Sequence, residues 1–188
     1  MDSPLRPTLY KHVLTLAFIG SYLIDFHTSS AQECSPITCN EPGRGNINCT
    51  KCVHEIDCIN KDLSKIPNCN GAGIESLDLR KNQIQDFEDD LNHYSELKKL
   101  CLEDNKMTEI EPETFGSLGS LKELLLHRNL IDSIHEESFK EGLRGIEIIN
   151  LASNKLKSFD VSTFQNLSSL KKLYLGNNSL LTIPNEAF

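Results

Sequence analysis

Apolar residues recur along residues 74–188 in a long pattern that neither a helical nor a strand period explains alone. In LKKLCLEDN (97–105), Leu100 and Leu102 alternate with other residues as in a strand that is buried on one face. The pattern starts again, at offsets of 23, 24, 25 and 24 residues, at Ile74, Leu97, Leu121, Ile146 and Leu170. Self-similarity of this kind is typical of repeat architectures, so we predict five stacked structural units.

Each unit also carries an asparagine in phase with its apolar residues: Asn82, Asn105, Asn129, Asn154 and Asn178. Apolar residues follow each asparagine by two and by five positions, and in the last four units a phenylalanine follows by ten. An asparagine amide offers both donors and an acceptor, so we expect it to pair with backbone groups where the chain turns inward after the strand. A single unit buries too little surface to fold alone, whereas stacked units share one core.

These motifs resemble the extracellular form of the leucine-rich repeat family, in which L-x-x-L-x-L-x-x-N-x-L is followed by further apolar positions and a phenylalanine. The resemblance covers about residues 56–188. It implies an α/β solenoid, a horseshoe segment with short parallel β-strands on its concave face and irregular or helical turns on its convex side. It also implies a disulfide-rich N-terminal cap. It says little about function, because the family has many unrelated partners.

The first 31 residues are typical of a secretory signal peptide, because Arg6 and Lys11 precede an apolar run over 13–24. That run is too short for an ordinary membrane span, although an uncleaved anchor is the alternative. We therefore predict a signal peptide over 1–31, a cysteine-rich cap over 32–73 and five repeats over 74–188. No C-terminal cap follows Phe188. This predicts either an N-terminal fragment or short isoform of a longer membrane receptor, or a chain that self-associates through its open end.

Six of the seven cysteines lie in the predicted cap: Cys34, Cys39, Cys49, Cys52, Cys58 and Cys69. In a secreted protein such a cluster indicates a disulfide framework, and six cysteines allow fifteen connectivities. IDCINKDLSKIP (56–67) resembles the end of the family's cap, which implies that Cys58 is the last cap cysteine; the C-x-C pair common in the family is missing. Zinc bound by Cys49, Cys52, Cys58, Cys69 and His54 is the alternative, but the spacing is not that of a familiar finger. We predict no metal and no cofactor.

The residues between the inward leucines are expected to face the concave surface. The candidate ligand-binding residues are Asp78, Arg80, Lys99, Glu103, Glu123, Leu125, His127, Ile148, Asn150, Lys172 and Tyr174. Leu125, Ile148 and Tyr174 form an apolar group there, and exposed apolar groups often mark protein contacts. The alternative is that these three are scattered surface residues.

Cys101 stands on the same predicted face, away from the cap. It is expected to be a partly shielded free thiol. The alternatives are a disulfide with a cap cysteine, which would leave another cysteine unpaired, or a bridge to a second chain.

Three sequons predict N-glycosylation at Asn48, Asn166 and Asn177. The net charge of −8, without a basic stripe, argues against nucleic acid as a partner. Because the chain has no P-loop, G-x-S-x-G or H-E-x-x-H motif, we do not expect an enzyme. The sequence therefore predicts a secreted module that binds an extracellular protein through its concave face. A matrix protein resembling the small leucine-rich proteoglycans is the alternative.

Overall fold

The computed structural model divides into two compact units, Met1–Glu33 and Cys34–Phe188. It describes residues 54–67, 73–140 and 142–184, together with the backbone of three short strands nearer the N-terminus. Two of those strands, β1 (Phe18–Ile19) and β2 (Tyr22–Leu23), form an antiparallel pair in the first unit. The rest of the predicted signal peptide lies outside the described residues.

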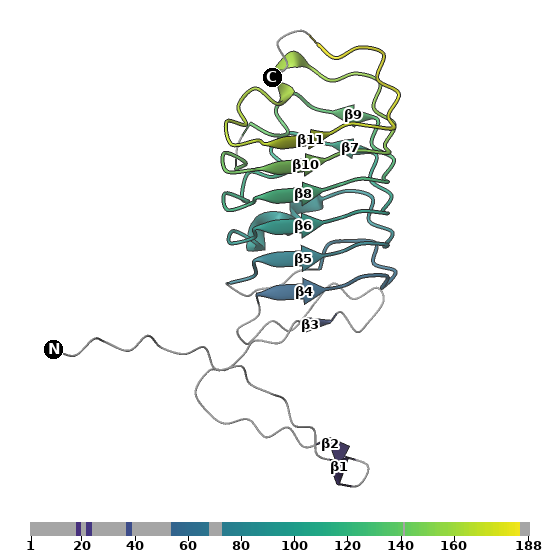
Figure 1. Cartoon of the computed structure of the whole chain (residues 1–188), viewed down its shortest axis with the longest axis vertical. Coiled ribbons are helices and arrows are strands. Elements are labelled where there is room, and N and C mark those ends of the chain that lie inside the picture. The colour runs from purple at the N-terminus through teal and green to yellow at the C-terminus, as the bar shows by residue number, and fades with distance from the viewer. Residues whose placement is uncertain are drawn as a thin grey trace, which may run out of the picture. The chain divides into compact units, whose positions relative to one another are not determined.

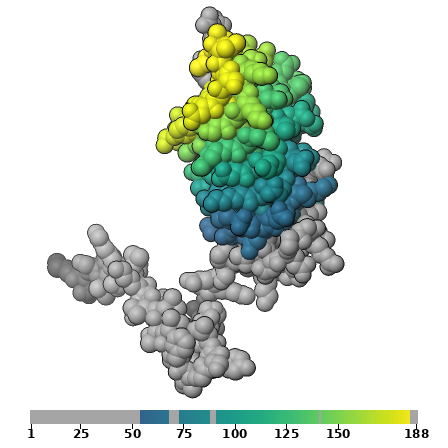
Figure 2. Space-filling view, turned by 90° about the vertical axis from the view of Figure 1, so that its right-hand side faces the viewer, coloured from purple at the N-terminus to yellow at the C-terminus, as the bar shows by residue number. Residues whose placement is uncertain are grey.

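The second unit is a solenoid whose strands form one parallel sheet (Figure 1). In sheet order these strands are β3 (Ile37–Thr38), β4 (Glu55–Asp57), β5 (Ser76–Asp78), β6 (Lys99–Cys101), β8 (Glu123–Leu125), β10 (Ile148–Asn150) and β11 (Lys172–Tyr174). Successive turns of the chain stack in order along the unit (Figure 2). The predicted fold class, a solenoid with short parallel strands and few helices, is confirmed.

The strand register explains why the leucines recur. Leu77, Leu100 and Leu124 are partners in adjacent strands, and all three are fully buried. Parallel strands whose side chains alternate across the sheet place every inward residue above its counterpart in the previous turn. The apolar positions of the five units therefore form one continuous core, to which each turn adds a layer.

The side of the solenoid opposite the main sheet is irregular, as expected. It carries the short parallel pair β7 (Glu109–Ile110) and β9 (Ser133–Ile134) and two 3-10 helices, η1 (Glu88–His93) and η2 (Val161–Thr163). Phenylalanines stack along the interior of this side. The ring centroids of Phe115 and Phe139 lie 5.6 Å apart, and those of Phe139 and Phe164 lie 5.5 Å apart. Ring stacking at such distances stabilises the contact between turns beyond simple burial.

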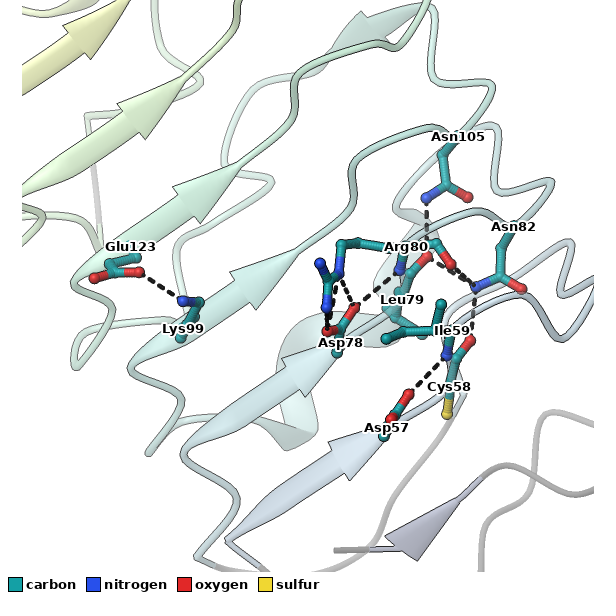
Figure 3. A network of polar contacts seen from close by, with 10 residues as sticks. All are labelled: Asp57, Cys58, Ile59, Asp78, Leu79, Arg80, Asn82, Lys99, Asn105 and Glu123. Carbon is teal, nitrogen blue, oxygen red and sulfur yellow. Dashed lines mark hydrogen bonds and ion pairs between the residues drawn. The ribbon is translucent and has the colours of Figure 1, made fainter.

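The asparagines connect adjacent turns through buried hydrogen bonds. The Asn105 amide donates to the Leu79 carbonyl of the preceding turn and to the Leu102 carbonyl of its own turn, both at 3.0 Å. Its carbonyl oxygen accepts the Ile84 N–H at 3.1 Å. Figure 3 shows the Asn82 and Asn105 amides beside the Leu79 carbonyl. Four of the five asparagines are buried and Asn178 is half-buried, so the ladder satisfies backbone groups that water cannot reach.

Candidate protein-binding face

The outward-facing residues of the main sheet, called here the sheet face, occupy the predicted concave surface. The strand register arranges them in three rows that run across the turns. The first row is Glu55, Ser76, Lys99, Glu123, Ile148 and Lys172, and the second is Asp57, Asp78, Cys101, Leu125, Asn150 and Tyr174. The third row continues the register beyond the strand ends as Ile59, Arg80, Glu103, His127, Ala152 and Gly176.

Two ion pairs dominate the charged part of the sheet face (Figure 3). Arg80 Nη2 lies 2.6 Å from Asp78 Oδ2, and Arg80 Nε donates to both carboxylate oxygens at 2.8 and 3.0 Å. The Lys99 ammonium lies 3.0 Å from Glu123 Oε2. The hydrogen bond from each cation to its carboxylate raises the pKa of Arg80 and of Lys99, so both remain charged.

Glu103 differs from the expectation of an exposed contact residue, because it is only 6% exposed. Its Oε2 atom is buried and has no hydrogen-bond partner. Loss of water around the carboxylate raises its pKa, and the charge of Arg80 opposes that rise only in part. Arg80 is the neighbouring third-row residue in the adjacent turn, and its charge and that of Lys99 act on Glu103.

His127 lies beside Glu103 in the third row, as the hydrogen bond from the Asp104 N–H to the His127 carbonyl shows. The side chain is half-buried, and its Nδ1 atom is buried without a partner. Desolvation, followed by the nearby charge of Arg128, lowers the pKa of His127. The imidazole is therefore neutral at pH 7, and an unprotonated ring nitrogen accepts rather than donates a hydrogen bond.

Cys101 is a free thiol on the second row, and it is more deeply buried than expected, at 4% exposure. Burial, and after it the negative charges of Glu103 and Asp78, raise the pKa of the thiol to about 12. Such a group forms almost no thiolate at neutral pH and is a poor nucleophile. A bridge from Cys101 to a second chain remains an untested prediction.

The other end of the sheet face carries its apolar residues, beside Asn150 and the exposed Lys172. Leu125 and Ile148 are half-buried, and Tyr174 is 46% exposed. The third row here carries only small residues, and a Cβ atom added at Gly176 would meet nothing within 4 Å. The register separates Leu125 from Tyr174 by Asn150, so the three apolar side chains lie across adjacent turns rather than in one row.

The remaining predicted sites are described only in part. Cys58 is fully buried and disulfide-bonded, whereas Cys34, Cys39, Cys49, Cys52, Cys69 and the sequon at Asn48 lie outside the described residues. The cap framework and its pairing therefore stay predictions. Asn166 is exposed in a turn that follows Phe164, and Asn177 is exposed beside the ladder residue Asn178.

Within the described ranges, no helix has the length and hydropathy of a membrane span. Over the same residues, no three His, Cys, Asp or Glu side chains gather as a metal would require.

Sequence reasoning identified the members of the sheet face but missed the two unpartnered atoms on it. The pattern places Glu103 and His127 outward, yet burial there depends on how neighbouring side chains lie across turns. The adjacent third-row positions of the two residues, 24 residues apart, were the available signal. This spacing predicts that Glu103 and His127 lie close together, but it does not predict that their side-chain atoms are buried.

Comparisons with known proteins agree with this architecture. The family model described as "Leucine rich repeat" matches residues 95–156 and 144–188, which together make up half of the chain. The chain is 32% identical over 99 residues to "Leucine-rich repeat-containing G-protein coupled receptor 5" of Xenopus tropicalis. That match covers 48% of this chain but only 11% of the receptor.

A crystal structure of a TLR13–ssRNA13 complex superimposes with a TM-score of 0.62 and 20% sequence identity. The superposition covers 78% of this chain and 25% of that chain, so it shows a shared fold. Repeat pattern, solenoid and family match agree, and the chain belongs to the leucine-rich repeat family.

Proposed function

We propose that this chain is an extracellular recognition module that binds a protein ligand through the sheet face. The observation that carries the proposal is the exposed Tyr174, with Ile148 and Leu125 nearby, at one end of a face whose other end is charged. Tyrosine and aliphatic side chains beside a polar border are typical of the centre of protein interfaces. A solenoid sheet is also rigid, which lowers the entropic cost of binding.

The extracellular location rests on the signal-like segment over 1–31 and the cysteine-rich segment after it. The similarity to a G-protein coupled receptor supports a receptor-like role, although the chain spans about a tenth of that protein's length. We accordingly propose adhesion, guidance or innate immune recognition as the class of activity, in this chain or in a longer membrane receptor of which it forms part. We propose no catalytic role.

The proposal is tested by screening the secreted chain against an array of purified extracellular domains. A double variant, Tyr174→Ala with Ile148→Ala, should weaken binding to any captured ligand about thirtyfold, which corresponds to the loss of roughly 2 kcal/mol expected at an interface hot spot. A matched control, Glu136→Ala with Lys157→Ala, removes two exposed side chains outside the sheet and should bind as the wild type does. Equal weakening by both variants, or by neither, contradicts the proposal.

The alternative is a matrix protein that acts by assembly. Binding of the purified chain to collagen fibrils, unaffected by the Tyr174 and Ile148 changes, would favour it over recognition. The mixed chemistry of the sheet face favours recognition, because charged residues border the apolar group: Glu123 shares a strand with Leu125, and Lys172 shares a strand with Tyr174.

A further inference from the structure

We propose that the charged part of the sheet face receives an arginine or lysine side chain of the protein ligand, held by Glu103 and His127. The inference rests on the proposed function, because it names the chemistry of one part of the ligand. Three observations carry it, each from a different property of the face.

The first observation is the charge balance. The outward residues from β4 to the turn of β8 carry five carboxylates, Glu55, Asp57, Asp78, Glu103 and Glu123, against two cations, Arg80 and Lys99. This part of the face therefore has a surplus of three negative charges when all five carboxylates are ionised. Complementary potential at an interface calls for a cationic partner surface.

The second observation is that one of the three carboxylates left without a cation, Glu103, is buried. Arg80 is held by Asp78 through contacts of 2.6 to 3.0 Å, and Lys99 is held by Glu123 at 3.0 Å. Glu103, 6% exposed, accepts no hydrogen bond at Oε2. A buried carboxylate oxygen without a partner is costly to the folded chain, and a bound donor removes that cost.

The third observation is a second buried polar atom without a partner, in the adjacent turn. His127 Nδ1 is that atom, and His127 is the lateral neighbour of Glu103. In the tautomer that carries its proton on Nε2, Nδ1 is an acceptor. Two neighbouring acceptors call for a ligand group with several donors. The guanidinium of arginine offers five and the ammonium of lysine three, whereas carboxylates and carbonyls offer none.

Long and partly exposed side chains border this position, and their movement would give a ligand access to it. The Arg80 and Lys99 side chains, which interact electrostatically with Glu103, are 44% and 45% exposed and are long and flexible. Beyond His127 the row continues with Ala152 and Gly176, where a Cβ atom at Gly176 would meet open space. A polypeptide segment lying there brings its cation to Glu103 while its apolar side chains reach Tyr174. A small free cation would leave the apolar end unused.

The test is selection of random twelve-residue peptides on the purified full-length chain, with sheet-face binders defined by their loss on Tyr174→Ala. We expect these peptides to be rich in arginine or lysine and to bind Glu103→Gln about tenfold to a hundredfold more weakly, as expected for loss of a charge-assisted hydrogen bond. Replacing the peptide arginine by citrulline, which is neutral and of similar shape, should weaken binding to the wild type but not to Glu103→Gln. Glu136→Gln, an exposed carboxylate outside the sheet, is the matched control.

A folding measurement accompanies the selection. Glu103→Gln should unfold at the same temperature as the wild type or higher, because the change removes an unpartnered buried charge; lower stability would indicate a structural role and overturn the inference. Should Glu103→Gln fold poorly, His127→Leu tests the second acceptor and should weaken the same peptides several-fold.

Sheet-face peptides without basic residues, or basic peptides indifferent to Glu103→Gln, overturn this inference and leave the proposed function standing. Binding of spermidine in place of any peptide overturns the assignment to a protein segment. No sheet-face binder at all overturns both proposals.

Discussion

Replacing Asn129, the third of the five asparagines, by alanine tests the hydrogen-bond ladder at its middle. The Asn129 amide donates to the carbonyls of Leu102 at 2.8 Å and Leu126 at 3.0 Å, and its oxygen accepts the Met107 N–H at 3.1 Å. The side chain is only 5% exposed, so water does not replace it. Asn129→Ala therefore leaves the buried Met107 N–H unpaired, at a cost of about 1–3 kcal/mol. The Leu102 and Leu126 carbonyls each lose one of two donors, because Asn105 and Asn154 still donate to them, at a cost of about 0.5–1.5 kcal/mol each. Together we expect a loss of roughly 2–6 kcal/mol in the free energy of unfolding.

The measurement is urea denaturation followed by circular dichroism, with the slope of the transition unchanged and its midpoint lowered. Asn129→Asp should be as destabilising at pH 7, because it keeps the acceptor but turns carboxylate oxygens toward two carbonyls. Asn92→Ala, an exposed position in η1, is the control and should change stability by no more than about 0.5 kcal/mol. A loss below about 1 kcal/mol for Asn129→Ala would refute the claim that the ladder holds adjacent turns together.

Three further predictions concern other positions. Gly142→Ala should lower the free energy of unfolding by several kcal/mol in a thermal melt, because the φ of Gly142 is +77° and the new Cβ would lie 2.1 Å from the Phe115 carbonyl oxygen. Gly119→Ala is the control and should be nearly neutral, because a Cβ there would meet nothing within 4 Å. Cys101 should resist iodoacetamide at pH 7.5 until the protein unfolds, as followed by mass spectrometry. Because the folded pKa is about 12 and the ordinary value 9.0, wild-type stability should fall between those pH values more steeply than that of Cys101→Ala. Asn166→Gln should remove one glycan from the protein secreted by animal cells, seen as a mass shift; an unchanged mass contradicts the predicted sequon use.

The sequence predicted the parts of this fold that depend on periodicity. Leu100 and Leu124 lie opposite each other in adjacent strands of the core, because a repeat of about 24 residues sets the strand register. The stacked rings of Phe115 and Phe139 follow from the same phase. Any structural feature that recurs once per turn can be predicted from the repeat period in the same way.

The first repeat shows where periodicity stopped being informative. It has no phenylalanine ten residues after Asn82, and the structure instead places the 3-10 helix η1 there with Leu91 buried and Tyr94 buried just after it. Phe87 then meets Phe115 edge to face, at 5.1 Å and 78°, rather than in a stack. The packing of the first repeat differs from that of the other repeats and depends on how individual side chains fit together. The repeat pattern of the sequence does not reveal that fit.

The sequence predicted which residues form the candidate site, but it did not predict their burial or their hydrogen-bond partners. Alternation along the strand placed Glu103 outward, whereas its burial, to 6% exposure, depends on side chains that meet only in three dimensions. The unpartnered Nδ1 of His127 likewise depends on ring orientation within a packed face. The net charge of −8 was visible from composition, whereas the buried Glu103 oxygen without a partner could be identified only from the three-dimensional structure.

The parallel sheet, in which every strand bonds only to the turn before and the turn after, has a mechanical consequence. Over residues 73–140 and 142–184, backbone hydrogen bonds between turns join neighbouring turns, so tension on this part of the solenoid should release the turns one after another. Each released coil of about 24 residues would add on the order of 80 Å of slack at full extension. A cell-surface tether built this way would yield gradually under load and take up the strain of two cells moving apart.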